Sequence, residues 1–147
     1  MVPIVLLVHG PNLNLLGQRE PDVYGTATLD DYVLHTGRLA ESLGLQLESY
    51  QSNHEGDIVD RIHQDRQRVD ALIVNAGALT HYSWSLHDAL ATFAGPIVEV
   101  HISQPNAREP WRHTSVVAPV ASGSIAGFGL LGYELAIRAI SDLLQVR

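Results

Sequence analysis

The 147-residue sequence has no cysteine and no lysine, and all nine of its basic Lys/Arg positions are arginines. Without cysteine, neither a disulfide framework nor thiolate catalysis is possible. Without lysine, a Schiff base on a lysine side chain and the lysine of a phosphate-binding P-loop are both excluded. The formal net charge is -7, and the arginines are scattered singly, so we expect no nucleic-acid partner.

Long hydrophobic runs are also scarce. The opening MVPIVLLVHG stops at Gly10 and Pro11, too short for a membrane span, and it lacks the basic region and cleavage site of a signal peptide. We expect a buried first strand, no membrane partner and a cytoplasmic location. The length and the 46% share of hydrophobic residues predict a single domain over residues 1–147.

Apolar, β-branched runs alternate with segments of helical periodicity. The predicted strands are Pro3 to His9, Leu45 to Tyr50, Ala71 to Val74, Ile97 to Val100 and a shorter one at Val116 to Val117. The predicted helices run from about Leu29 to Leu43, from Ser52 onward, from about Trp84 to Phe93, and from about Gly132 to Leu144. This alternation predicts an α/β fold, a flavodoxin-like doubly wound sheet of five mostly parallel strands with helices on both faces.

Two helix starts carry capping signals. Thr28 and Asp31 are expected to cap the first helix, which Gly44 ends. Ser52 and Glu55 have the S-x-x-E spacing of a capping box, which predicts that the second helix starts at Ser52.

In a doubly wound sheet, ligands bind beyond the carboxyl ends of the strands. Four segments follow predicted strands there: 10–25, 51–53, 75–81 and 101–112. The first is a long connection rich in glycine and proline, and loops of this length are often lids. We therefore predict an active-site lid loop at about residues 10–25.

These segments contain ordered motifs: GPNLNLLGQREPDVYG, QSNHEG, NAGALTHYS, EVHISQPNAREPWRHTS and the glycine-rich GFGLLGY. Together they resemble the type II 3-dehydroquinate dehydratases of the shikimate and quinate pathways, over essentially the whole chain. Gln104, Pro105 and Asn106 depart from the residues more common in that family, which affects only the expected substrate-carboxylate loop. The resemblance implies a lyase of aromatic amino acid biosynthesis or quinate breakdown that forms an enolate from 3-dehydroquinate without a cofactor, and that assembles as a homododecamer, a tetramer of trimers.

The resemblance implies that Tyr24 is the catalytic base. A free tyrosine side chain has a pKa near ~10, so a tyrosine base needs help to ionise. Arg19, five residues earlier on the same loop, can favour the tyrosinate through its positive charge. By itself each residue is more often an ordinary loop residue, and it is their joint place in REPDVYG that favours the catalytic interpretation.

Further roles follow from the same resemblance. His101 is the expected acid that protonates the leaving hydroxyl, since histidine titrates near neutrality. Asn12 is expected to stabilise the enolate, with water as the intermediary. Arg108 and Glu109 are interpreted as a structural pair. The expected substrate-binding residues are Asn75, His81, Ile102, Ser103 and Arg112, together with Asp88 acting in a neighbouring subunit's site.

Other functions have sequence requirements that can be compared with this chain. The eight histidines invite a metal site, but none has a recognisable ligand spacing with a carboxylate partner, so no metal is expected. Phospho-receiver domains of similar fold need an acidic cluster at the strand ends and a lysine, and this chain has neither. Flavin carriers need a hydroxyl-rich phosphate loop after the first strand, whereas this chain has GPNLNLLG there. A catalytically inactive relative is a third alternative, although every residue that the mechanism requires is present.

Overall fold

The computed structural model describes residues 1–145. The strands are β1 (Ile4–His9), β2 (Gln46–Gln51), β3 (Ala71–Asn75), β4 (Ile97–His101) and β5 (Gly123–Ala126). The helices are α1 (Pro21–Tyr24), α2 (Leu29–Ser42), α3 (Glu55–Asp65), α4 (Trp84–Ala91) and α5 (Leu130–Gln145). Short 3-10 helices are η1 (Leu13–Leu15), η2 (Gly77–His81), η3 (Pro105–Ala107), η4 (Pro110–His113) and η5 (Ala118–Val120).

The five strands form one sheet in the order β2-β1-β3-β4-β5, and every neighbouring pair is parallel. This confirms the predicted doubly wound, flavodoxin-like sheet. The strand order reverses direction at β1, where His9 pairs with Asn75 on one side and Gln51 on the other. A crevice at such a switch point is where ligands bind in this class of fold.

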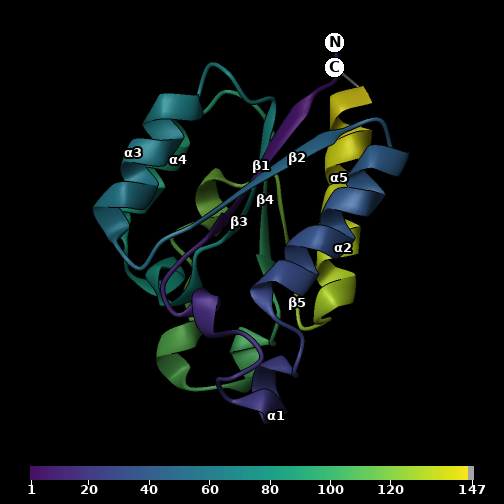
Figure 1. The fold of residues 1–147 in the computed structure, drawn as a ribbon. Coiled ribbons are helices and arrows are strands. Elements are labelled where there is room, and N and C mark those ends of the chain that lie inside the picture. The colour runs from purple at the N-terminus through teal and green to yellow at the C-terminus, as the bar shows by residue number, and fades with distance from the viewer. Residues whose placement is uncertain (146–147) are drawn as a thin grey trace.

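Helices cover both faces of the sheet, with α2 and α5 on one side and α3 and α4 on the other (Figure 1). Because successive strand residues point to opposite faces, Val5 and Leu7 pack toward the α2/α5 side. Leu6 and Val8 pack toward the α3/α4 side. A central strand buried on both faces must be hydrophobic throughout, which explains the uninterrupted apolar run that marked β1 in the sequence.

The predicted helices occur, with one error at a helix start. Thr28 and Asp31 form a reciprocal capping box at α2, as predicted. The prediction for Ser52 was wrong, because the N-cap residue of α3 is His54. The backbone of Ser52 still belongs to the sheet edge, where its N–H donates to the His9 carbonyl at 3.1 Å. Its hydroxyl accepts from the His54 N–H at 2.9 Å, and Glu55 accepts from Ser83 instead.

The predicted fifth strand was misplaced. Val116 and Val117 are buried but lie in a connecting segment, and the strand β5 begins at Gly123. Val117 packs in the hydrophobic cluster that contains Leu86 and Leu90 of α4, and the Val116 N–H donates to the Thr80 carbonyl at 2.8 Å. β5 itself is a short edge strand of small residues, which carries little hydrophobic signal.

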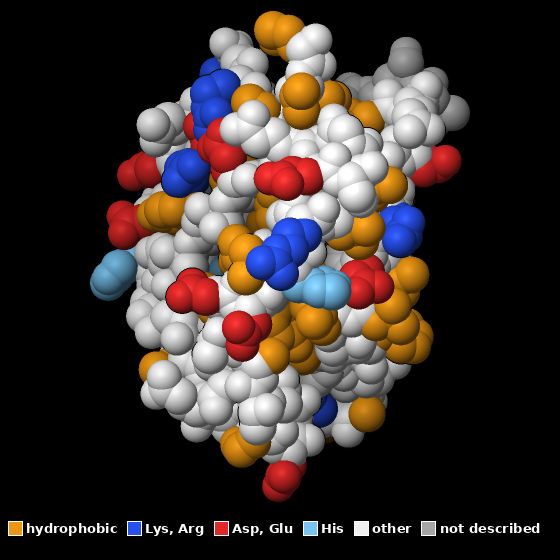
Figure 2. Space-filling view, turned by 45° about the vertical axis from the view of Figure 1, so that its right-hand side comes forward, with side chains coloured by type: hydrophobic (Ala, Val, Ile, Leu, Met, Phe, Trp, Pro, Cys, Tyr) orange, Lys and Arg blue, Asp and Glu red, His pale blue; other side chains and the backbone are white. Residues whose placement is uncertain are grey.

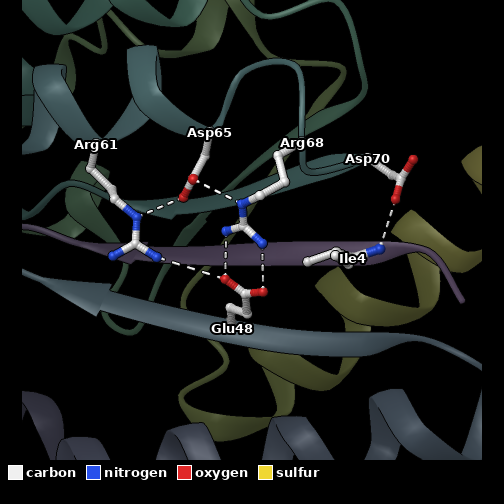
Figure 3. Close-up of polar contacts among 6 residues, drawn as sticks. All are labelled: Ile4, Glu48, Arg61, Asp65, Arg68 and Asp70. Atoms are coloured by element: carbon white, nitrogen blue, oxygen red, sulfur yellow. Dashed lines mark hydrogen bonds and ion pairs between the residues drawn. The ribbon is translucent and has the colours of Figure 1, made fainter.

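The outer strand β2 is tied to the end of α3 by an ionic network (Figure 3). Arg68 donates to both carboxylate oxygens of Glu48 at 2.9 and 2.7 Å. Asp65 accepts from Arg61 at 2.6 Å and from Arg68 at 3.1 Å. Burial opposes ionisation of Asp65, but the hydrogen bonds from the two arginines outweigh it and lower its pKa below the ordinary value. In this edge network each charge therefore has an opposite partner.

On the face that carries α2 and α5, acidic, basic and hydrophobic side chains are intermixed (Figure 2). Leu34, Leu131 and Leu135 are among the large hydrophobic residues that are exposed in the chain. No helix within residues 1–145 is both long and apolar enough to cross a membrane.

Candidate active site

A pocket opens beyond the carboxyl ends of β1, β3 and β4. Figure 1 places α1 and the green segment that contains η3 and η4 together at this end of the sheet. Of the residues singled out in the sequence, the pocket is lined by Asn12, Arg19, Tyr24, Asn75, His81, His101, Ile102, Ser103 and Arg112. Arg108 also lines it.

Asp88 is the one predicted site residue that the chain keeps apart from the pocket. It lies on α4 with its side chain exposed. Asp88 therefore lies outside the pocket of its own subunit, and its role in a neighbouring subunit's site stays a prediction.

The first connection is shaped around Asn12. This residue adopts a left-handed backbone conformation, with φ of 70°. Its N–H donates to Asn53 Oδ1 at 2.9 Å, and Gln51 Nε2 donates to the same oxygen at 3.1 Å and to the Gly10 carbonyl at 3.2 Å. Gly10 is required here because a Cβ atom would lie 2.1 Å from the Ala76 carbonyl oxygen. The segment after β2 therefore holds the loop that carries Asn12.

Tyr24 lies between two guanidinium groups. The centre of the Arg19 guanidinium is 5.2 Å from the Tyr24 ring centroid, and that of Arg108 is 5.3 Å from it. Arg108 Nη1 also donates to the Tyr24 hydroxyl oxygen at 2.8 Å and to Ser103 Oγ at 3.1 Å. Two positive charges therefore lie beside Tyr24, and Arg108 contacts its oxygen directly.

The interpretation of Arg108 and Glu109 as a structural pair is incomplete, because the two residues do form an ion pair but Arg108 also contacts Tyr24. The closest described approach between their charged atoms is 3.8 Å, whereas Arg108 binds the hydroxyl of Tyr24. Arg108 and Tyr24 are 84 positions apart in the sequence, so no local pattern joins them. Arg108 is thus a site residue that sequence reasoning missed.

His101 is held by a buried carboxylate that sequence reasoning also missed. Glu99 Oε2 accepts from His101 Nε2 at 2.6 Å, and the carboxylate also accepts from Ser115 Oγ at 2.8 Å and Ser124 Oγ at 3.0 Å. Burial works to raise the pKa of Glu99, but the hydrogen bond and charge of His101 and the two serines together lower it. Nδ1 is therefore the ring nitrogen of His101 left for a ligand. The available sequence signal was a lone acid two residues before His101 in an apolar strand, hence on the same face.

His81 and Arg112 also line the pocket. Because a carbonyl oxygen only accepts, His81 Nδ1 donates to Thr114 O at 2.7 Å, which leaves Nε2 as an acceptor. Burial is the largest of the influences that lower the pKa of His81, and the charges of His101 and Arg112 act in the same direction. The His81 and His101 rings stack with centroids 6.4 Å apart.

Arg112 is oriented for binding an anion. Its Nε donates to Glu109 at 2.9 Å, and its guanidinium lies 4.0 Å from the centroid of the Trp111 ring. Its two terminal nitrogens contact no acceptor among residues 1–145, so the fork that suits a carboxylate is available. The backbone N–H groups of Ile102 and Ser103, on the same pocket wall, donate to no other described residue.

Asn75 lies on the floor of the pocket. Its Nδ2 donates to Tyr133 Oη at 3.0 Å, and its Oδ1 accepts from the Gly77 N–H at 3.3 Å. Within residues 1–145, His, Asp and Glu side chains are nowhere grouped in threes as possible metal ligands. The chemistry of the pocket is that of proton transfer and anion binding by arginine, histidine, tyrosine and amide groups.

Comparisons with known proteins agree with this geometry. The model of the family described as Dehydroquinase class II matches residues 3–141. A 3-dehydroquinate dehydratase from Bacillus licheniformis is 51% identical over 136 residues, which cover 92% of this chain and 94% of that protein. A catabolic 3-dehydroquinase from Aspergillus clavatus is 50% identical over 137 residues, with 93% and 91% covered. The crystal structure of a type II dehydroquinase from Propionibacterium acnes has a TM-score of 0.92 and 41% identity, and the match covers 97% of this chain and 98% of that one.

Proposed function

The chain belongs to the class II dehydroquinase family, and from this premise we propose that it is a hydro-lyase converting 3-dehydroquinate to 3-dehydroshikimate through an enolate. The observation that carries the proposal is one pocket with Tyr24 between two arginines and the carboxylate-bound His101. The reaction belongs to the shikimate route of aromatic amino acid biosynthesis or to quinate breakdown, and one of the similar proteins is named for the catabolic role.

Tyr24 is the proposed base. Its phenolate oxygen removes the proton from the carbon beside the substrate carbonyl, and the electron pair of that C–H bond moves to form the enolate. Arg108, which donates to the Tyr24 oxygen, and Arg19, which lies against the ring, supply the charge that stabilises the phenolate. Because the chain has no lysine, an imine on a lysine side chain is not an alternative way to activate the ketone.

His101 is the proposed acid. As the enolate collapses, the C–O bond to the leaving hydroxyl breaks, and the proton on His101 Nδ1 completes a water molecule. Glu99 accepts a hydrogen bond from the Nε2–H group of the same ring. This hydrogen bond orients Nδ1, and the carboxylate compensates the charge of the doubly protonated imidazole. The proton held by Tyr24 then returns to solvent and His101 takes one up, so each turnover releases one water.

Asn12 and Arg112 complete the proposed binding of substrate. Asn12 stabilises the enolate oxygen through a water molecule, in a loop position supported by Asn53. Arg112 clamps the substrate carboxylate together with the N–H groups of Ile102 and Ser103. Asn75 and His81 bind the ring hydroxyls. No cofactor takes part in the proposed reaction.

Several wider features belong to the same proposal. The segment 10–25, which carries Asn12, Arg19 and Tyr24 on one wall of the pocket, acts as a lid. The assembly is a homododecamer, a tetramer of trimers, in which Asp88 of one subunit reaches a neighbour's site. The protein is a single catalytic domain that works in the cytoplasm, and it binds a small molecule without nucleic acid, membrane or metal.

A direct assay tests the function. On addition of 3-dehydroquinate, purified protein is expected to produce the absorbance of the conjugated enone, and Tyr24→Phe protein prepared in parallel is the control. Absence of enone formation by folded wild-type protein would contradict the proposed activity.

For the assembly, light scattering is expected to give the mass of twelve subunits. A monomer with full turnover would contradict both the assembly and the role of Asp88.

A further inference from the structure

Behind the pocket, three polar side chains form a buried chain at the switch point of the sheet. His9 and Asn75 are register partners at the ends of β1 and β3, and Tyr133 reaches them from α5. His9 and Tyr133 are 0% exposed, and Asn75 is 4% exposed. Tyr133 Oη lies 2.8 Å from His9 Nε2 and 3.0 Å from Asn75 Nδ2. Only Asn75 of the three lines the pocket.

The direction of each hydrogen bond follows from the donors available. The Gly77 N–H donates to the side-chain oxygen of Asn75, so the Asn75 amide nitrogen must be the atom that faces Tyr133. Since Tyr133 Oη accepts from Asn75, the Tyr133 proton is directed to His9 Nε2, the other polar atom it contacts. His9 is then a neutral ring that carries its proton on Nδ1.

The neutral state of His9 agrees with its surroundings. Burial lowers the pKa of His9 to about 3, so the ring carries no charge at neutral pH. His9 Nδ1 is buried without a hydrogen-bond partner among the described residues. An unpaired buried N–H is unfavourable, and an apolar side chain in the same place would avoid it. Packing alone therefore does not explain a histidine at this position.

We propose that His9 and Tyr133 are positioning residues that fix the side-chain amide of Asn75. One N–H of Asn75 Nδ2 is used by Tyr133, and its other N–H remains for a ligand in the pocket. Without Tyr133 Oη the side-chain amide of Asn75 can rotate. It would then present its oxygen, an acceptor, where the ligand requires an N–H donor. That the ligand group is a ring hydroxyl of 3-dehydroquinate rests on the proposed function.

A double-mutant cycle tests the coupling. Tyr133→Phe keeps the ring, which stacks on His9, and removes only the hydroxyl. We expect kcat/KM for 3-dehydroquinate to fall about tenfold, mainly through KM, in the wild-type background and less than twofold in an Asn75→Ala background. Tyr32→Phe is the matched control, because Tyr32 is also buried and packs edge-on against Tyr133 but makes no described contact with Asn75. It should leave kcat/KM within twofold of wild type.

A pair of substitutions at His9 tests the hydrogen bond between Tyr133 and His9. His9→Leu removes the acceptor of the Tyr133 proton, which can then turn only toward Asn75 and invert its amide. We expect a loss similar to that of Tyr133→Phe and no further loss when the two are combined. His9→Gln supplies an amide oxygen as acceptor and should recover part of the activity. If Tyr133→Phe protein fails to fold, the cycle of His9→Leu with Asn75→Ala carries the same test.

A spectroscopic measurement separates this inference from the proposed function. In protein labelled with ¹⁵N-asparagine, the side-chain amide signal of Asn75 is expected to shift in Tyr133→Phe and in His9→Leu but not in Tyr32→Phe, without any substrate. Wild-type protein that fails to turn over 3-dehydroquinate, yet shows these shifts, would overturn only the substrate assignment. Wild-type turnover with equal kcat/KM in Tyr133→Phe and Tyr32→Phe would overturn the positioning role.

Discussion

Two regions of this molecule use arginine in opposite ways. At the sheet edge, Arg61 and Arg68 meet the carboxylates of Glu48 and Asp65, with N–O distances of 2.6 to 3.7 Å. In the pocket, Arg19 and Arg108 lie 3.4 and 3.8 Å from Glu20, and Arg112 Nε lies 2.9 Å from Glu109. Glu20 is itself about half exposed to solvent.

The difference shows which arginines are built for structure and which for a ligand. A guanidinium whose donors are matched by carboxylates has little capacity left for a further anion. The pocket arginines instead contact a hydroxyl, an aromatic ring and solvated acids, so their positive charge remains for an anion that arrives or forms there. A substrate carboxylate, an enolate and a tyrosinate are three such anions.

Removing the Tyr24 hydroxyl should give the largest effect. Tyr24→Phe is expected to reduce turnover at least about 1000-fold, the order expected when a general base is lost. Because Tyr24 is only partly buried, the variant should fold and still bind a ring-carboxylate inhibitor. Steady-state kinetics and inhibitor titration measure the two properties. Near-normal turnover would show that the arginines around Tyr24 serve another group.

Removing a pocket arginine should affect binding more than folding. In Arg112→Ala the substrate carboxylate loses a charge-assisted fork, and we expect affinity for carboxylate inhibitors to weaken by roughly 1.5 to 3 kcal/mol. Calorimetric titration gives this quantity, and thermal unfolding of the same preparation is the control. Unchanged affinity would remove Arg112 from the ligand site.

Disrupting the ionic network at the sheet edge should affect folding more than catalysis. Asp65→Asn is expected to lower the free energy of unfolding by about 1 to 3 kcal/mol at neutral pH, with kcat/KM unchanged. Asp60→Asn, at an exposed position on the same helix, is the matched control. Since the pKa of Asp65 is lowered on folding from 3.8, its charge stabilises the fold above about that pH and ceases to do so as the pH falls further. The difference between variant and wild type should therefore shrink below pH 3.8, and a loss of turnover without a loss of stability would break the comparison.

Much of the fold was predictable because it rests on local patterns. Apolar, β-branched runs marked four strands, hydrophobicity of period 3.6 marked the helices, and the cap at Thr28 is a three-residue signal. The failures have long-range causes. Ser52 has a capping sequence, but its N–H is taken by His9 across the sheet. Val116 and Val117 are buried outside the sheet, and Val117 packs in the hydrophobic cluster that contains Leu86 and Leu90 of α4.

The site shows the same division between local and distant information. Motifs placed Tyr24, Arg19, His101 and Arg112 in segments that the sheet brings together. The hydrogen bond from Arg108 to Tyr24 spans 84 residues, and the bond between His9 and Tyr133 spans 124. No periodicity or spacing in the sequence contains such pairs, so only the folded chain reveals them.

We propose that the positive charges of Arg19 and Arg108 make Tyr24 a base, and the pH dependence of single turnovers tests this role most directly. Single-turnover conditions keep product release from hiding the proton transfer. In wild type, the rate should rise with pH through the ionisation of Tyr24. In Arg19→Ala and in Arg108→Ala the rate should fall and that rise should move to higher pH, with the larger move in Arg108→Ala because Arg108 contacts the oxygen directly. Asp65→Asn, which disturbs the arginines of the edge network, should leave the profile unchanged. A lower rate with an unmoved profile in both pocket variants would contradict the account.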